Sequence, residues 1–256
     1  MPSVAIWTLS LSVLLGLVAF KVRSATAGAA LAGAAITASL MFATVSFPYM
    51  PWKTGLAPVL LLLVMTSLAT RAGRKHKESL GTAESKRGRA AAQVAANLGV
   101  AAIVSNALVL SWMVKQTWLP QARFFPAIAF CLGLAALAEA AADTVSSELG
   151  QMLSGHPRMI TTFRKAEPGT DGAISLRGTM AGVVAAALVA ASGTWALNGG
   201  WLMLAISWSG GVFGLFFDSL LGATLERRGW INNDAVNFLS TASAAAFALA
   251  LLAVIS

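Results

Sequence analysis

The chain has 256 residues, of which 57% are hydrophobic and 11% are charged, with a formal net charge of +8. This composition is too apolar for a soluble domain, and the length exceeds what one or two membrane anchors need. The positive charge does not indicate nucleic-acid binding, because Lys and Arg lie in short segments between apolar runs, where they typically set membrane orientation. Cys131 is the only cysteine, which excludes disulfides and multi-cysteine metal sites.

Apolar runs of about 17 to 25 residues predict about eight membrane-spanning helices. The fold class is therefore an all-α, polytopic transmembrane helical bundle, in a single integral membrane domain over residues 1–256. The first run lacks a basic n-region and is followed at once by Lys21 and Arg23, so we expect it to be retained. The predicted spans are 4–20, 25–46, 55–70, 91–112, 124–147, 178–195, 201–224 and 235–255.

Lys and Arg are distributed unequally between the two sets of loops. Of the 18 basic residues, 15 lie in loops 21–24, 71–90, 148–177 and 225–234, and three lie in loops 47–54, 113–123 and 196–200. The positive-inside rule places the first set in the cytoplasm or its equivalent, with both chain ends on the far side. The acids lie in the same loops or in the nearest halves of the spans. A transporter is expected to bind near the midplane and to contain an internal repeat, so this pattern favours an enzyme at the cytoplasmic face.

The stretch LAEAAADTVSSELG, residues 137–150, places acids at the end of the fifth span. Glu139 and Asp143 are four residues apart and so share one helix face, with Ser146 and Ser147 one turn further on. A carboxylate inside a bilayer costs at least roughly 2.5 kcal/mol and normally faces a polar cavity, a partner or a metal. The alternative is that these groups only bond neighbouring helices.

The stretch DSLLGATLERRGWINNDAVNFLS begins at Asp218 and repeats small or acidic residues at Gly222 and Glu226. Asp234, near the start of the eighth span, is either a further acid of the site or a helix cap. Carboxylates from two or three helices at one depth suit Mg²⁺, and a structural salt-bridge network is the alternative. The predicted catalytic acids are Glu139, Asp143, Asp218 and Asp234, the first three as metal ligands.

Two loops carry the donors that hold phosphates. The basic loop 71–90 leads into a helix with two amide side chains at i, i+4, and it also fits a role in topology or in contact with anionic lipids. In loop 148–177, glycines and hydroxyl residues alternate with basic residues, as in a phosphate cradle or an ordinary Gly/Pro turn. The predicted nucleotide- and phosphate-binding residues are Lys77, Arg87, Arg89, Gln93, Asn97, Arg158, Arg164, Thr170, Asp171, Gly172, Ser175, Arg177, Asn233 and Asn237.

The stretches RAGRKHKESLGTAESKRGRAAAQVAANLG, AEAAADTVSSELG, PGTDGAISLRGTMAG and DSLLGATLERRGWINNDAVNFLS together resemble a known family. These are the integral membrane proteins that include the phytyl-phosphate kinases of tocopherol and phytol salvage, and the resemblance covers nearly the whole chain. The acid stretch followed by the glycine-rich stretch is also similar in layout to phytol and dolichol kinases and to phosphatidate cytidylyltransferases, which use CTP and Mg²⁺. Those proteins have a Ser-Pro-Lys-type loop where this chain has Gly-Thr-Asp-Gly, so the resemblance does not imply the nucleotide base.

The resemblance implies a multi-pass membrane kinase, in a plasma or thylakoid-type membrane, with its active face cytoplasmic or equivalent. It would use Mg²⁺ to transfer a phosphoryl group from a nucleoside triphosphate, CTP or ATP, to phytyl phosphate or a related prenyl monophosphate. The expected partners are these two substrates and the lipid bilayer, with no nucleic acid and the oligomeric state left open. We expect the prenyl chain to lie in a groove opened by the small residues of spans two, four and six. A CTP-dependent cytidylyltransferase and a non-enzymatic prenyl-phosphate carrier are the alternatives.

Overall fold

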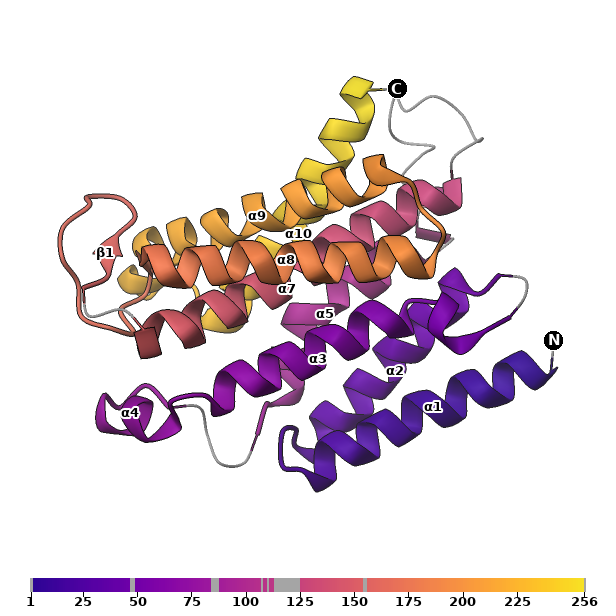
Figure 1. Cartoon of the computed structure of the whole chain (residues 1–256), viewed down its shortest axis with the longest axis horizontal. Helices are drawn as coiled ribbons and strands as arrows, with labels where there is room; N and C mark the ends of the chain where they lie inside the picture. The colour runs from indigo at the N-terminus through magenta and orange to yellow at the C-terminus, as the bar shows by residue number, and fades with distance from the viewer. Residues whose placement is uncertain are drawn as a thin grey trace.

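The computed structural model describes residues 2–46, 49–83, 88–106, 108–109, 111–112, 125–153 and 156–255, and each of the eight predicted spans is helical there (Figure 1). The long helices are α1 (Pro2–Lys21), α2 (Ala27–Thr44), α3 (Leu56–Arg71), α5 (Ala91–Ser105), α7 (Phe125–Leu153), α8 (Leu176–Ala196), α9 (Trp201–Thr224) and α10 (Asn233–Ile255). The short elements are η1 (Pro51–Lys53), α4 (Arg74–Ser79), β1 (Arg158–Met159), β2 (Ala173–Ile174) and η2 (Glu226–Arg228).

The helices confirm the all-α bundle, but they are not equal in length. Within the described residues, six are long and apolar enough to cross a membrane, namely α1, α2, α7, α8, α9 and α10. The third and fourth predicted spans are shorter, because α3 has 16 residues and α5 has 15. At 1.5 Å per residue such helices reach roughly 24 Å, which is less than the roughly 30 Å of a hydrocarbon core. The antiparallel pair β1–β2 is a local addition in the loop between α7 and α8.

Helix α7 is the centre of the bundle, and 83% of its apolar span is buried, against 22–39% for the other five. It packs against α3, α5, α8, α9 and α10. Small side chains on both sides make this packing close. A Cβ at Gly211 of α9 would lie 2.8 Å from the Cβ of Ala138, and one at Gly182 of α8 would lie 2.7 Å from the carbonyl oxygen of Ala142. Small residues at such crossings let membrane helices approach one another's backbones.

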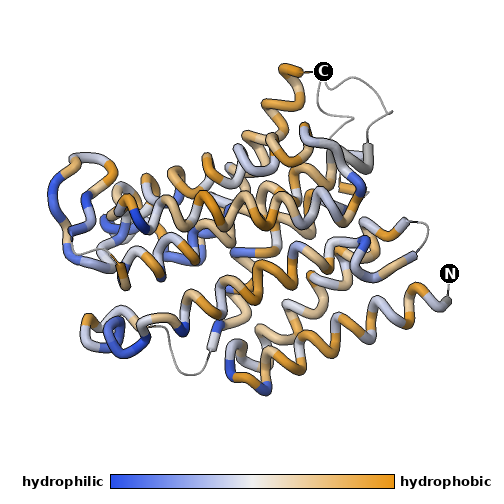
Figure 2. Tube along the Cα trace, viewed as in Figure 1, coloured by the Kyte–Doolittle hydropathy of each residue, from blue (hydrophilic) through white to orange (hydrophobic). Residues whose placement is uncertain are grey.

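The N-terminal helices pack differently. Helix α1 lies against α2, and α2 lies against α5, whereas α3 lies against α7 and α8 and meets α2 only sparsely. The outer side of α1 exposes large apolar residues, as expected of a lipid-facing helix. Hydrophilic residues gather at the end of the bundle that carries α4 and the β1–β2 segment, at the left of Figure 2.

Lys77 of α4 ties the end of α3 to α7. Its side chain is 1% exposed. The ammonium group donates to the carbonyl oxygens of Ala69 (3.0 Å) and Thr70 (2.9 Å) and to Glu148 Oε2 (2.6 Å). These acceptors take all three of its N–H groups and cover the free carbonyls at the end of α3. The structure therefore does not support the predicted phosphate-binding role of Lys77, because no donor is left for a ligand.

The segment between α7 and α8 folds back onto the end of α9. Ile160 N donates to the carbonyl oxygen of Gly172 at 3.1 Å and steadies the turn. Gly172 has φ +74°, and a Cβ there would lie 2.3 Å from Ala223 N. Gly222 faces it, since a Cβ on Gly222 would lie 2.9 Å from Gly172 N. Two glycines thus let the loop backbone rest directly on the helix.

We expect Lys77→Ala to lower the stability of the protein by about 3 kcal/mol, because Glu148, whose side chain is 13% exposed, would keep a largely buried charge without a partner. Thermal unfolding in detergent measures this. Arg74→Ala is the control, since its pair with Glu78 is much more exposed and is worth at most about 1 kcal/mol. A Lys77→Ala protein with normal stability and no activity would restore the role predicted from the sequence.

We expect Gly172→Ala to lower the unfolding temperature more than Gly229→Ala does, and to expose the segment 156–175 to limited proteolysis. Both glycines have positive φ, +74° and +71°, so each substitution carries a backbone cost of roughly 1–2 kcal/mol. Only at Gly172 does the added Cβ also meet the backbone of α9. Equal effects of the two substitutions would contradict the tight docking of the loop.

Candidate functional site

A polar pocket of about 150 Å³ lies where α7 and α9 end and α10 begins, beneath the docked loop. Helix α7 contributes Asp143, and α9 contributes Asp218. The loop covers the pocket with the stretch 168–175. Further lining residues are Ser146, Ser147, Gly150, Gln151, Pro157, Leu215, Ser219, Gly222, Glu226 and Asn233. The structure therefore brings together several residues that the sequence placed in one site.

Two carboxyl groups meet in this pocket. The side chains of Asp143 and Asp218 lie within hydrogen-bonding distance of each other, so the structure brings these two acids of separate helices together. Asp218 Oδ2 is buried and has no hydrogen-bond partner among the described residues. Two carboxylates in contact repel each other unless a proton or a cation lies between them. The pair is therefore suited to hold a cation.

Glu139 lies one turn deeper in α7, close to both aspartates, and is 1% exposed. Its Oε1 is also without a hydrogen-bond partner within the described part of the chain. The hydroxyl of Ser240 on α10 faces Glu139 and Asp218 but donates to the carbonyl oxygen of Asn237 at 3.0 Å. A Cβ on Gly214 of α9 would lie 2.4 Å from Glu139 Cγ. Only a glycine at that position leaves room for the Glu139 side chain.

The pocket is acidic, with Asp143, Asp171, Asp218 and Glu226 around it and no Lys or Arg among its described lining residues. In the described ranges, no group of three or more His, Cys, Asp or Glu side chains could hold a metal ion. The predicted three-carboxylate site of Glu139, Asp143 and Asp218 is thus not formed by these side chains alone. Magnesium, however, usually binds one or two carboxylates together with water and substrate phosphates. The contacting pair with its unpartnered oxygen fits that kind of site.

The loop residues predicted to cradle a phosphate do face the pocket, and some also have local roles. Thr170, Asp171, Gly172 and Ser175 all line it. Thr170 Oγ1 donates to the carbonyl oxygen of Glu167 at 2.8 Å. Ser175 is the N-cap of α8, where its Oγ accepts from Gly178 N at 3.2 Å. Cap and turn geometry therefore explain part of the pattern that the sequence suggested for phosphate binding.

The arginines of the same loop do not line the pocket. Arg158 Nη1 donates to the carbonyl oxygen of Phe163 at 2.8 Å, and Arg177 Nη1 donates to that of Leu153 at 2.8 Å. Arg164 is exposed. Their predicted contact with the triphosphate is not supported by this arrangement, because these guanidinium groups hold or surround the loop instead. Arg87 lies outside the described residues.

The structure places the three residues predicted near the start of α10 in different surroundings. Asn233 lines the pocket. Asp234 lies in the first turn of α10 but lines neither this pocket nor the second cavity, and the cap is Asn232, whose Oδ1 accepts from Ala235 N at 2.9 Å. Asn237 is buried, and its carbonyl oxygen accepts from Ser240 and Thr241. Asp234 and Asn237 are therefore placed apart from the pocket lining.

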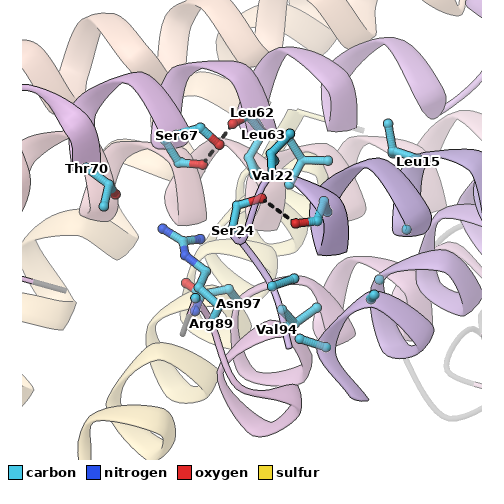
Figure 3. Close-up of a pocket in the computed structure, with 18 of the residues that line it drawn as sticks. Leu15, Val22, Ser24, Leu62, Leu63, Ser67, Thr70, Arg89, Val94 and Asn97 are labelled. Carbon is cyan, nitrogen blue, oxygen red and sulfur yellow. Dashed lines mark hydrogen bonds between the residues drawn. The ribbon is translucent and has the colours of Figure 1, made fainter. Parts of the chain in front are cut away.

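A second cavity of about 390 Å³ lies between α1, α2, α3 and α5 (Figure 3). Two predicted residues, Arg89 and Asn97, line it, and Asn97 Nδ2 donates to the carbonyl oxygen of Gln93 at 2.8 Å. Spans two and four border it as expected of a prenyl groove, but spans one and three complete it in place of span six. The sequence did not predict that spans one and three would line this groove, because their position results from the separation of α3 from α2 and not from a motif.

Comparisons with known proteins place the chain among integral membrane proteins. The family model described as Integral membrane protein DUF92 matches residues 10–245. An uncharacterized membrane protein of Methanocaldococcus jannaschii is 44% identical over 108 residues, which cover 42% of this chain and 45% of that protein. An uncharacterized membrane protein of Synechocystis sp. is 30% identical over 208 residues, which cover 77% of this chain and 73% of that protein.

A plant relative extends the comparison. Protein VTE6, chloroplastic, of Arabidopsis thaliana is 27% identical over 220 residues, which cover 83% of this chain and 64% of that protein. The chain thus spans less than half of the archaeal relative and just under two thirds of the plant one. No solved structure matches the chain. Since the family model covers nearly the whole sequence, the resemblance drawn from the sequence is confirmed, and the chain belongs to the DUF92 family of integral membrane proteins.

Proposed function

We propose that the protein is a membrane phosphotransferase that transfers the terminal phosphoryl group of a nucleoside triphosphate, CTP or ATP, to phytyl phosphate or a related prenyl monophosphate. The observation that carries this proposal is the contact between the carboxyls of Asp143 and Asp218 beneath the glycine-bearing loop. Two further facts support it. The sequence resembles phytyl-phosphate kinases, and the pocket lies at the end of helices long enough to cross a membrane.

The reaction needs positioning more than a nucleophile from the protein. An oxygen of the acceptor phosphate attacks the γ-phosphorus, the bond from that phosphorus to the β–γ bridging oxygen breaks, and the nucleoside diphosphate leaves. The acceptor is already an anion near neutral pH, so no strong general base is required. The barrier to overcome is repulsion between two phosphorylated reactants.

Asp143 and Asp218 are the residues that would hold Mg²⁺, with the unpartnered Oδ2 of Asp218 available as a ligand. When bound, the ion would neutralise charge on the phosphate oxygens. Glu139, buried beside both aspartates, places a third carboxyl group next to this position. Such an ion would let an acidic pocket, with no Lys or Arg among its described lining residues, accept a triphosphate.

The covering loop supplies neutral donors. The hydroxyl of Ser175 lines the pocket with its hydrogen available to a ligand, because its oxygen accepts from Gly178 N, whereas Thr170 donates its own hydrogen to Glu167. Gly169 and Gly172 also line the pocket, but the Cβ positions of these glycines face Thr82 and Ala223. Donors of this kind orient phosphate oxygens without adding charge. The side-chain amide of Asn233 completes the polar wall from the side of α10. These residues would orient the triphosphate, and the carboxyl pair would hold its cation.

We expect Asp143→Asn and Asp218→Asn each to lower the rate of product formation on the order of 100-fold or more, because each removes charge that the cation requires. The assay uses purified protein with phytyl phosphate, Mg²⁺ and CTP or ATP. Detergent stability should stay close to that of the unchanged protein. Glu167→Gln, an exposed acid of the same loop that does not line the pocket, should retain activity. Equal loss of fold and activity in the aspartate variants would favour a structural role.

Product analysis in the same assay separates the proposed reaction from its rivals. A kinase releases the nucleoside diphosphate and forms the prenyl diphosphate. A cytidylyltransferase releases pyrophosphate and leaves a CDP-lipid. A prenyl-phosphate carrier binds the lipid and leaves the nucleotide unchanged. Either of the last two outcomes would replace the proposed function.

A further inference from the structure

We infer that the cavity between α1, α2, α3 and α5 binds the tail of a lipid monophosphate drawn from the bilayer, with Arg89 holding its phosphate toward the acidic pocket. That this phosphate then accepts a phosphoryl group rests on the proposed function. The binding itself does not, since it follows from the shape, polarity and charge of the cavity.

The cavity has the size and lining of a ligand site. Its volume of about 390 Å³ falls within the about 300–1,000 Å³ that is usual for small-molecule pockets. Apolar side chains from three helices surround it, among them Leu15, Leu62, Leu63 and Val94 (Figure 3). It exists because α3 packs toward α7 and α8 while α1 and α2 form a separate pair. An aliphatic or isoprenoid tail matches such a lining.

The charged residues that line the cavity lie at one of its ends. Arg23, Arg71, Arg74 and Arg89 line the cavity, and no Asp or Glu is among its described lining residues. Thr70 also lines it, and its Oγ1 is buried without a hydrogen-bond partner in the described part of the chain. Figure 3 shows the guanidinium group of Arg89 on the side of the cavity where Thr70 lies. An anionic head group is therefore favoured at this end.

Arg89 is held in place by its backbone. Its N–H donates to the carbonyl oxygen of Ser24 at 3.0 Å, and its own carbonyl oxygen accepts from Thr26 N at 3.0 Å. Gly88, with φ +77°, lets the chain lie so close to the turn between α1 and α2 that a Cβ there would be 2.6 Å from Ala25 N. The turn thus fixes the residue from which the guanidinium group extends.

Arg89 also connects the two cavities. Its side chain lines the apolar cavity, and it interacts electrostatically with Asp143, which lines the acidic pocket. A phosphate at Arg89 would therefore lie at the side of the cavity nearest the proposed donor site. The acidic pocket repels a free anion, whereas the arginine end attracts one, so the two phosphorylated substrates are directed to different cavities.

The occupant is a membrane lipid and not free phosphate. Inorganic phosphate or a soluble phosphate ester would leave the apolar wall between α1, α2, α3 and α5 without a partner. A lipid monophosphate fills both parts of the cavity, and the bilayer supplies it beside the exposed apolar face of α1. The tail would contribute most of the affinity through burial, and Arg89 would select the head group.

Binding of phytyl monophosphate to the full chain in phosphatidylcholine nanodiscs, without nucleotide, tests the inference. We expect Gly33→Leu to weaken binding about tenfold or more, because the side chain fills the cavity, where only Val94 Cγ1 lies near, 3.9 Å from an added Cβ. Gly99→Leu on α5 is the matched control, because nothing lies within 4 Å of a Cβ there and Gly99 does not line the cavity. Equal affinity of the two variants would overturn the inference.

The head group is tested separately. We expect Arg89→Gln to lower the affinity for phytyl monophosphate about tenfold or more while leaving the affinity for phytol unchanged. Inorganic phosphate at millimolar concentration should compete weakly, and strong competition would indicate a free-phosphate site instead. An unchanged affinity for the monophosphate in Arg89→Gln would overturn the role of this arginine.

Photo-crosslinking of the unchanged protein keeps the inference testable if a variant fails to fold. A phytyl monophosphate with a diazirine in its tail should label peptides of α2, α3 and α5, and labelling confined to the outer faces of α9 and α10 would overturn the site.

Turnover of the substrates distinguishes this inference from the proposed function. Cavity labelling without any product would leave the lipid site standing and would refute the kinase. Product formation that Gly33→Leu does not impair would refute the site and leave the kinase.

Discussion

The close approach of α9 to α7 is the constraint on which the acidic site depends. Carboxyls within a membrane bundle are costly unless polar groups, a proton or a cation meet them, so their positions are set by the backbone around them. Gly211 brings α9 against Ala138, and Gly214 makes room for Glu139. Asp218 follows one turn after Gly214 and meets Asp143. Larger side chains at these glycines would separate the helices, and the carboxyl pair with them.

Hydropathy predicted the helices, because their periodicity is local. The sequence placed Asp143 and Asp218 at one depth in separate spans, and the structure brings their side chains together. The basic residues that donate hydrogen bonds to phosphate were harder to predict. An arginine that binds phosphate and one that binds a backbone carbonyl look alike in sequence, and Arg177 proves to hold the end of α7. Lys77, predicted to bind phosphate, is instead buried against the end of α3, because α4 folds back onto that helix. No local sequence pattern predicts which helices line the large cavity, because this depends on the helices against which α3 packs. The magnesium ion stays a prediction.

The two cavities have opposite charge, and this difference bears on the proposed chemistry. One is lined by acids and polar loop atoms, and the other by apolar side chains and arginines. Transfer between two phosphorylated molecules requires them to approach despite their repulsion. A cation in the acidic pocket and a guanidinium group in the apolar cavity would each neutralise one partner. The electrostatic interaction between Arg89 and Asp143 then links the two sites across the bundle.

This arrangement gives α1 and α2 a role that their packing alone does not suggest. Only 22% of the apolar span of α1 is buried, so the helix adds little to the core. Its turn into α2 nevertheless provides both backbone partners of Arg89, and the two helices form one wall of the apolar cavity. Displacing that turn would change both a wall of the cavity and the position of Arg89. Tail binding and head-group placement would therefore change together, because one turn of backbone determines both.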